Sequence, residues 1–420
     1  MTCAVPLWLG RCCAERGEGM RGERRARARV LKLAIATLAT SASGNILWIY
    51  LILHARSRGA SEVVVSLITT SSSLMLLTSP LWGHVSDVAG RLRVAACGIS
   101  LLAASSLVAA SSRGALEFIS SRLLAGLGLA MFVPAVMAEM SGSGSRRGLS
   151  IGIYSASQSA GWALGLTLGG LVARALSTTH AFYLSLALSS IGLATLLTAT
   201  GGGGRTARTR APRAVVTKPL ALLFASSFFR DGSIIGAYSV LPVFLKELGA
   251  TDDLVGVVLA VNSLAQIPLM LLVGRLVDSI GEGPVFVCGV LGTSAVIIMY
   301  SVAGSPLDLL PVQVLLALSF SSFYVSSRSL ASRLVPGSVG AVLGALTLCR
   351  HAGGTLMPLL AGLTWAIWGI RGAFVALHLT SLLGLGMALA LLATMRGAPA
   401  PKSHGEQRGD GRSGYDQLVG

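Results

Sequence analysis

The sequence predicts an all-α polytopic membrane protein with twelve transmembrane helices in two pseudo-symmetric six-helix halves. The first observation is composition: 53% of the 420 residues are hydrophobic and only 12% are charged, whereas soluble domains carry about a quarter charged residues. The second is a series of apolar segments close to the ~20 residues that a helix needs to cross a bilayer. The third is a short polar loop that occurs twice.

The apolar segments alternate with short polar loops along the whole chain. The predicted spans are residues 33–53, 62–82, 93–111, 115–137, 149–172, 180–199, 219–244, 254–273, 284–303, 308–330, 338–364 and 372–395. The longest polar break between them begins with a run of glycines and continues with basic residues, which is typical of a flexible linker. We therefore expect a basic N-terminal tail (1–31), an N-terminal half (32–199), a linker (200–218), a C-terminal half (219–395) and a polar C-terminal tail (396–420).

Basic residues indicate the orientation of these spans. The net charge of +16 would suit a nucleic-acid partner, but most of the Lys and Arg residues flank apolar segments. With both termini in the cytoplasm, the cytoplasmic loops and tails hold roughly 23 of the 33 basic residues and the outer loops about six. We therefore expect a multi-pass plasma-membrane protein with both termini inside and no nucleic-acid partner. No cleavable signal peptide is evident, and either Met1 or Met20 could be the start.

The repeated loop has the frame Gly-x-x-x-Asp-x-x-Gly. The first copy contains Gly83, Asp87, Gly90 and Arg91, and the second contains Gly274, Asp278 and Gly281. Each copy lies between two apolar segments, which indicates two homologous membrane halves, as in many secondary transporters.

Physical roles follow from these residue types. We expect Gly83 and Gly90 to permit a tight turn and Asp87 to cap the helix that follows it. Arg91 would anchor the loop at the cytoplasmic surface. The alternative is a loop that only sets topology and caps a helix.

Two further motifs lie in the N-terminal half. Arg122-x-x-x-Gly126-x-Gly128-x-Ala130 lies in the fourth predicted span, and the fifth contains Gly152, Gly161, Gly165, Gly169 and Gly170. With the repeated loop, they resemble the major facilitator superfamily over about residues 31–396. The resemblance implies a latch role for the loop residues in an outward-facing state, and it links Arg122 to proton coupling.

This sequence departs from the family pattern in several places. Val88 and Leu92 stand where family loops carry basic residues, and Leu166 stands where the family's antiporter motif has proline. The glycine frame therefore does not establish export. We assign Gly161, Gly165 and Gly169 to close helix packing, with a gating hinge as the alternative.

Charged residues inside predicted spans are the candidates for the transport pathway. A charge at mid-helix costs about 2.5–3.5 kcal/mol on insertion scales, so it is expected to face a cavity or a partner. Arg230 and Asp231 lie roughly 17 Å from the cytoplasmic end of their span, and because neighbouring residues diverge by about 100° we do not expect them to neutralise each other. We expect Arg328 to snorkel from the cytoplasmic end of its span. The remaining candidates are Arg122, Arg350, His351, Asn45, Asn262 and Gln266, with Tyr324 a weaker one.

These observations predict a secondary active transporter of a small organic solute, working by alternating access as a monomer. The mostly positive central charge favours an anionic or polar solute, and Asp231 and His351 are the candidate proton carriers. There is no phosphate-binding loop of the ATPase type, no metal-ligand spacing among the six cysteines and no catalytic cluster, so we expect no enzyme activity, cofactor or metal. The alternatives are a multidrug/proton antiporter and a transporter-like sensor without flux.

Overall fold

The protein is helical throughout the part that the structure describes. The computed structural model describes residues 7–142, 147–199, 217–335 and 339–396, and it shows no strand within them. The predicted linker 200–218 and C-terminal tail 396–420 therefore fall almost wholly outside the described residues. The helices are α1 (Leu7–Ser57), α2 (Glu62–Leu76), α3 (Ser79–Ala89), α4 (Arg91–Ser111), α5 (Ala115–Gly142), α6 (Arg147–Ala175), α7 (Thr178–Leu197), α8 (Lys218–Glu247), α9 (Asp252–Ile280), α10 (Glu282–Val302), the short 3₁₀ turn η1 (Pro306–Asp308), α11 (Leu309–Leu334) and α12 (Val339–Arg396).

These helices account for the twelve predicted spans. Within the described residues, nine helices are individually long and apolar enough to cross a membrane, and α2 with α3 makes a tenth span bent by 43°. The 58-residue α12 contains two spans, because Gly369 interrupts it with a φ of 73°. The remaining span is α6, which contains many glycine and serine residues. The twelve-span prediction is confirmed.

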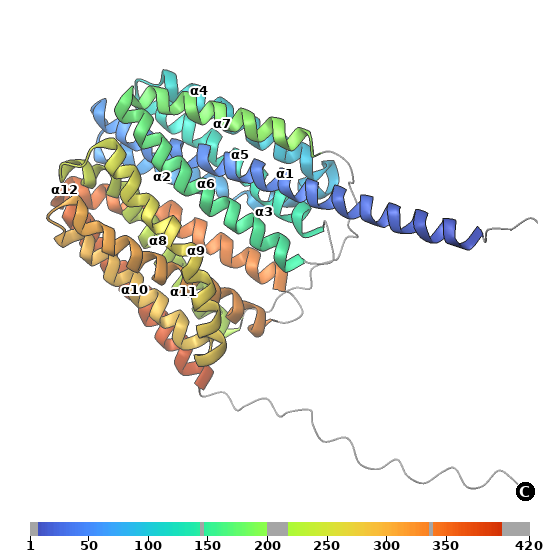
Figure 1. Ribbon diagram of the computed structural model, residues 1–420. Coiled ribbons are helices and arrows are strands. Elements are labelled where there is room, and N and C mark those ends of the chain that lie inside the picture. The colour runs from blue at the N-terminus through green and yellow to red at the C-terminus, as the bar shows by residue number, and fades with distance from the viewer. Residues whose placement is uncertain (1–6, 143–146, 200–216, 336–338, 397–420) are drawn as a thin grey trace, which may run out of the picture.

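The N-terminal region differs from the expectation of a tail followed by a span. A single helix, α1, begins at Leu7 and continues to Ser57. Figure 1 shows its first part extending well beyond the helical bundle. Residues 7–31 contain seven Arg and three each of Ala, Glu and Leu, all good helix formers, against four Gly, so the helix continues past the apolar segment.

The second span is bent where α2 ends and α3 begins. Pro80 stands in the first turn of α3, where its missing N–H removes no helical hydrogen bond. Two hydroxyl groups at the break donate to backbone carbonyls of the same span. Thr78 Oγ1 donates to the Met75 carbonyl at 2.6 Å, and Ser79 Oγ donates to the Leu76 carbonyl at 2.7 Å.

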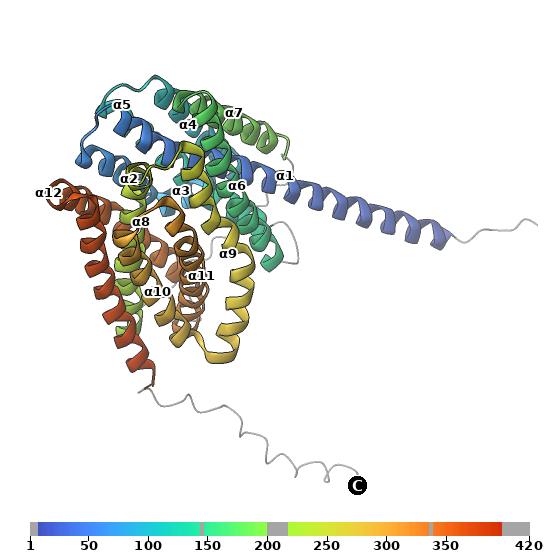
Figure 2. The same cartoon turned by 60° about the vertical axis from the view of Figure 1, so that its left-hand side comes forward.

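The helices form two bundles, α1–α7 and α8–α12 (Figures 1 and 2). We call the ends at which α7 finishes, α8 begins and α12 finishes the tail side, and the other ends the opposite side. The bundles converge on the opposite side and diverge towards the tail side (Figure 1). The result is two pseudo-symmetric six-span halves, as the repeated loop indicates.

Close contacts between the halves lie away from the tail side. A Cβ built on Gly170 of α6 would lie 2.7 Å from the Asp252 carbonyl oxygen of α9, and one built on Gly362 of α12 would lie 2.7 Å from Ser66 Cβ of α2. Arg174 Nη1 of α6 reaches Asp253 Oδ2 of α9 at 2.6 Å. On the tail side, by contrast, a Cβ on Gly274 would meet no described residue within 4 Å outside its own helix backbone and chain neighbours. The described parts of the halves are therefore in close contact on one side and diverge on the other (Figure 1).

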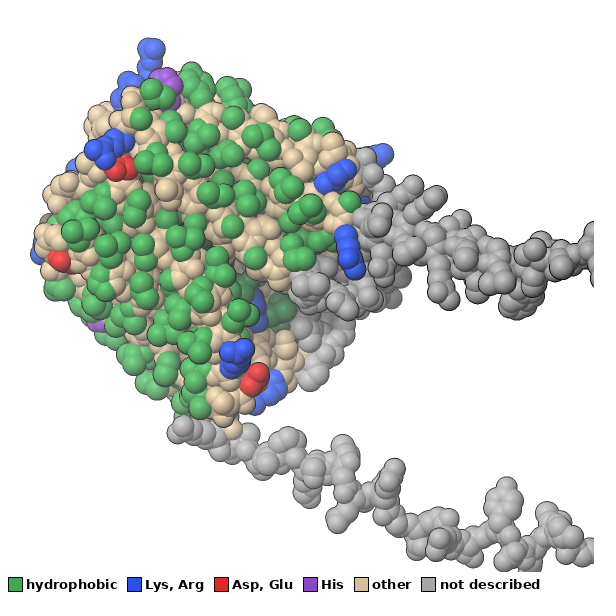
Figure 3. Space-filling model, viewed as in Figure 1, with side chains coloured by type: hydrophobic (Ala, Val, Ile, Leu, Met, Phe, Trp, Pro, Cys, Tyr) green, Lys and Arg blue, Asp and Glu red, His purple; other side chains and the backbone are tan. Residues whose placement is uncertain are grey.

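The outer surface matches a lipid environment. Figure 3 shows a face covered mainly by hydrophobic side chains, with the charged groups mostly near the helix ends. Inside the N-terminal half, hydroxyl groups join three helices: Ser43 Oγ of α1 lies 2.8 Å from Ser185 Oγ of α7, which lies 2.9 Å from Ser106 Oγ of α4. Such polar contacts and close packing hold helices together where lipid supplies no hydrophobic driving force between them.

Glycines in α6 allow it to lie close against α1. A Cβ on Gly161 would lie 2.9 Å from Ser41 Cβ, one on Gly165 would lie 2.8 Å from Ala42 Cα, and one on Gly169 would lie 2.5 Å from a ring carbon of Tyr50. Real Cβ atoms do not approach this closely, so larger residues would force the two helices apart. The contacts support a packing role for all three glycines.

We expect Gly165→Ala to lower the free energy of unfolding by about 1–3 kcal/mol, because the new methyl group overlaps the α1 backbone. Gly152→Ala on the same helix is the matched control, since its Cβ would meet no described neighbour within 4 Å. That change should be neutral or stabilising by about 0.5–1 kcal/mol. Thermal unfolding of both purified variants compares them, and equal melting temperatures together with reduced flux in Gly165→Ala would favour the hinge alternative instead.

Candidate functional site

A pocket in the C-terminal half gathers charged and aromatic side chains from α8, α11 and α12. The free space between its side chains is about 280 Å³, open solvent included. Its lining consists of Asp231, Phe320, Phe323, Tyr324, Arg328, Leu346, Thr347 and Arg350. All of these residues lie in the middle or tail-side parts of their helices, so the pocket is on the side where the halves separate.

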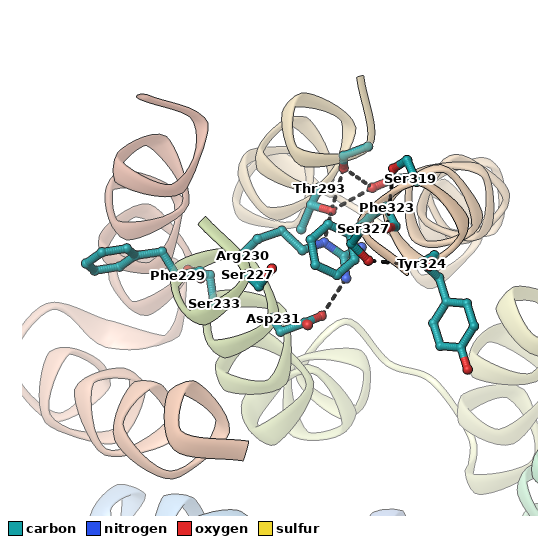
Figure 4. Close-up of polar contacts among 12 residues, drawn as sticks. Ser227, Phe229, Arg230, Asp231, Ser233, Thr293, Ser319, Phe323, Tyr324 and Ser327 are labelled. Atoms are coloured by element: carbon teal, nitrogen blue, oxygen red, sulfur yellow. Dashed lines mark hydrogen bonds and ion pairs between the residues drawn. The ribbon is translucent and has the colours of Figure 1, made fainter. Parts of the chain in front are cut away.

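Arg230 and Asp231 form an ion pair, so the expectation that they do not neutralise each other is wrong. Arg230 Nη1 donates to Asp231 Oδ1 at 2.7 Å, and Arg230 Nε donates to Thr293 Oγ1 of α10 at 2.7 Å (Figure 4). The Arg230 Cζ atom also lies 4.4 Å from the ring centre of Phe323. The angular argument failed because it considered only the directions of the Cα–Cβ bonds, whereas the long arginine side chain can bend back to its neighbour.

The two residues occupy different positions relative to the pocket. Arg230 is completely buried and does not line the pocket, whereas Asp231 does. The Arg230 guanidinium therefore fixes the position of the Asp231 carboxylate without facing the pocket itself. Arg230 would act on a solute indirectly, through Asp231 and the aromatic rings.

Arg350 stands without a partner in the pocket wall. Its side chain makes no hydrogen bond or ion pair with any residue that the structure describes, and its Nε is buried. An unpaired buried donor of a charged group costs free energy unless a ligand or water supplies an acceptor. Arg350 is therefore the residue of this pocket best placed to bind an incoming acceptor.

Arg328 also lines the pocket, contrary to the expectation that it snorkels. Its Cζ atom lies 3.3 Å from the ring centre of Tyr324, and its Nη1 donates to the Tyr324 carbonyl at 3.2 Å. The Tyr324 ring, one helical turn earlier, keeps the Arg328 guanidinium away from the tail-side end of α11. The signal was present in the sequence, since Phe320, Tyr324 and Arg328 are four residues apart and share one helix face.

Asn262 and Gln266 belong to a separate polar chain. Gln266 Nε2 donates to Asn262 Oδ1 at 2.6 Å, and Asn262 Nδ2 donates to the Gln313 carbonyl at 3.3 Å. Tyr238 OH donates to Gln313 Oε1 at 2.9 Å, so the chain joins α8, α9 and α11. The two carboxamides thus hydrogen-bond to each other or to the backbone, and neither lines the pocket.

The other predicted pathway residues do not meet in the pocket. His351 follows Arg350 on α12 but does not line the pocket. Asn45 lies in the N-terminal half and donates from Nδ2 to the Ser41 carbonyl of its own helix at 3.3 Å. Arg122 is also in that half, buried, with Nε and Nη1 lacking a partner among the described residues. Of the predicted set, the pocket brings together Asp231, Arg350 and the weaker candidate Tyr324, with Arg230 behind them.

The repeated loop differs in two respects from the expectation. Gly83 lies within α3, where its Cβ would be in ordinary contact with Pro134 of α5, so it does not form the turn. The turns come from the second glycine of each copy, Gly90 with a φ of 103° and Gly281 with a φ of 89°, which glycine adopts without steric cost. Gly274 is likewise within a helix, α9.

Asp87 does not cap the following helix, because it stands in the last turn of α3, before Gly90. It instead pairs with Arg91 Nη2 at 2.9 Å, while Arg91 Nη1 donates to the Ala138 carbonyl of α5 at 3.0 Å. Both partners belong to the N-terminal half. In the second copy Asp278 is exposed and makes no ion pair within the described residues.

Comparison with known proteins identifies the family. The Major Facilitator Superfamily matches residues 33–240 and 220–415 of this chain. The MFS-type transporter SLC18B1 of Rattus norvegicus is 26% identical over 207 residues, which are 46% of this chain and 44% of the relative, and its Homo sapiens counterpart is 26% identical over 197 residues, 43% and 42% of the two chains. The matched part is thus less than half the length of these curated relatives.

Solved structures share the fold at low identity. A bacterial homologue of the human lysosomal transporter Spinster, inward-facing and unoccupied, superposes with a TM-score of 0.75 at 12% identity, covering 90% of this chain and 99% of that one. A mutant of the nucleoside transporter NupG superposes with a TM-score of 0.73 at 13% identity, covering 88% and 99%. With its family match extending over most of the sequence, the chain belongs to the Major Facilitator Superfamily, whose members carry small solutes across membranes.

Proposed function

We propose that this protein is a secondary active transporter that moves a small organic solute with an anionic group, coupled to protons. The observation that carries the proposal is the charge of the pocket. Arg328 and Arg350 both line it, and its one carboxylate, Asp231, is already paired with Arg230. The lining therefore has excess positive charge, which favours an anionic solute over a cationic one.

The arrangement of the halves supports alternating access. The pocket lies in the middle to tail-side part of its helices, and the close inter-half contacts lie on the opposite side. We place the protein in the plasma membrane as a monomer, with the tail side and both termini in the cytoplasm, following the distribution of basic residues. In that orientation this conformation is inward-facing.

Asp231 is the proposed proton carrier. It lines the pocket and its partner Arg230 is fully buried, so protonating the carboxylate would remove an ion pair at the edge of the solute site. The charge balance of the pocket would then change as the solute binds or leaves. His351 is the second candidate, because it neighbours Arg350 on α12.

Flux in proteoliposomes tests the proposal. Candidate anions are first screened for thermal stabilisation of the purified protein, and uptake of the hits is measured with and without a pH gradient. We expect Asp231→Asn to abolish pH-driven accumulation and to preserve solute exchange at equal pH, since exchange needs no net proton movement. Uptake that requires ATP, or that ignores every imposed ion gradient, would contradict the coupling.

The proposed latch gives a separate prediction. Asp87→Asn should change the melting temperature little, because half-exposed ion pairs such as Asp87–Arg91 contribute only about 0–1 kcal/mol. Transport should fall severalfold if Asp87 contacts the other half in the outward-facing state. Accessibility of single cysteines from each side measures the balance between the two states. Glu117→Gln, on an exposed carboxylate at the opposite side, is the control; an unchanged balance with normal flux in Asp87→Asn would remove the latch role.

A further inference from the structure

One face of α11 carries a column of flat groups. The rings of Phe320 and Tyr324 are stacked, with centres 5.4 Å apart and planes inclined by 29°. The Arg328 guanidinium covers Tyr324 at 3.3 Å, and at the other end the Arg230 guanidinium lies 5.6 Å from the centre of Phe320. Because each member is held by the next, Arg328 presents a fixed plane before any solute arrives.

The column ends in the pocket. One N–H of Arg328 donates to the Tyr324 carbonyl, and the other Arg328 donors have no partner among the described residues. Arg350 faces the same pocket from α12, likewise unpaired within the described residues. The two guanidinium groups repel each other, so a ligand placed against both would gain most if it carried negative charge.

We propose that the pocket takes a planar aromatic or heteroaromatic anion whose ring stacks on Arg328 and whose anionic group is bound by Arg350. This inference rests on the proposed transport of an anion and adds the shape of the solute. A planar conjugated ring can lie flat against the guanidinium and extend the column, whereas a puckered ring cannot. Carboxylates and phosphates match the fork of donors that an arginine presents.

The positions of the two arginines limit the length of the solute. The anionic group would be attached directly or through a short arm, because Arg328 and Arg350 line the same small cavity.

Three probes of similar size separate charge from planarity. Binding of benzoate, cyclohexanecarboxylate and benzamide to the full chain in nanodiscs is measured by calorimetric titration. Benzoate has both the ring and the charge, and each of the others lacks one of them. We expect benzoate to bind about tenfold more tightly than cyclohexanecarboxylate, the magnitude of one desolvated cation–π contact. It should also bind at least about tenfold more tightly than benzamide, the magnitude of one hydrogen bond to a charged group.

Variants of the pocket assign each preference to a residue. Tyr324→Leu removes the support of Arg328 and should make benzoate and cyclohexanecarboxylate equal, whereas Tyr324→Phe should keep the preference. Arg350→Gln should weaken both acids about tenfold or more and leave benzamide unchanged. Arg333→Gln is the control, because Arg333 is on the same helix but pairs with Glu282 outside the pocket.

The outcomes distinguish this inference from the function on which it rests. Equal binding of the two acids to the unmodified protein, or a benzoate preference that survives in folded Tyr324→Leu, would overturn the planar-ring inference and leave anion transport standing. Benzamide binding as tightly as benzoate would overturn the anionic solute itself. Failure of both acids to bind at millimolar concentrations would overturn both.

Discussion

Replacing Asp231 with alanine should destabilise the protein by about 3–5 kcal/mol, the usual cost of removing one partner of a buried ion pair. Arg230 is completely buried, and Asp231 is its ion-pair partner within the described residues. Without that carboxylate the guanidinium keeps the Thr293 hydroxyl and the aromatic rings but has no counter-charge. Asp231→Asn should cost less, because the amide oxygen can still accept from Arg230 Nη1.

A double variant distinguishes the free-energy cost of leaving Arg230 unpaired from the cost of losing the Asp231 side chain. Arg230→Met combined with Asp231→Ala removes the unpaired charge and should recover most of the stability. Glu282→Ala is the control, since it breaks an ion pair whose arginine is 56% exposed, and it should cost at most about 1 kcal/mol. Thermal unfolding in one detergent compares all the variants. A loss for Asp231→Ala no larger than for Glu282→Ala would show that the pair is well solvated.

Gly256→Val should drive the halves apart on the opposite side. Gly256 belongs to α9, and a Cβ there would lie 2.6 Å from the Tyr50 hydroxyl and 3.1 Å from the Leu166 carbonyl carbon of the other half. Overpacking of this kind costs about 1–3 kcal/mol, which changes a two-state population about 5- to 150-fold. The sealed arrangement should therefore lose population, and net transport should fall with it.

Labelling of one engineered cysteine measures the shift. Thr347→Cys places a thiol in the pocket wall, in a background whose six native cysteines are replaced by serine. An impermeant maleimide added from the tail side should react more slowly in Gly256→Val than in the parent. Gly386→Val, on the exposed face of α12 with nothing within 4 Å of the Cβ among the described residues, should leave the rate unchanged. Equal rates in Gly256→Val and Gly386→Val would mean that this contact does not control the seal.

Features that depend on local sequence were predictable, and features that depend on side-chain reach were not. Apolar segments of span length are visible in the sequence, so the twelve spans were predicted, and the positive φ of Gly90 and Gly281 agrees with the turn residues of the repeat. The Arg230–Asp231 pair depends on the rotamer of a long side chain, which Cα geometry does not determine. Arg328 was misassigned although its four-residue spacing from Tyr324 places both on one helix face, because the contact between the two side chains was not considered.

Helix boundaries were likewise predictable only in part from the sequence. The sequence indicated where apolar segments end, but helical backbone can continue beyond them, as in α1. It can also break within one, as between α2 and α3, where a proline and two hydroxyl groups make an interruption possible. Gly83 was assigned to a turn because its spacing matches the repeat, yet the turn needs only Gly90.

The bend of the second span bears on how the halves can move. The hydroxyl bonds of Thr78 and Ser79 at the bend end on carbonyls three residues earlier in the same span. Separating or approaching the other half therefore breaks none of these bonds and forms none. These two hydrogen bonds should therefore persist in every state of the transport cycle, so the local interactions that support the angle between α2 and α3 do not depend on the position of the other half.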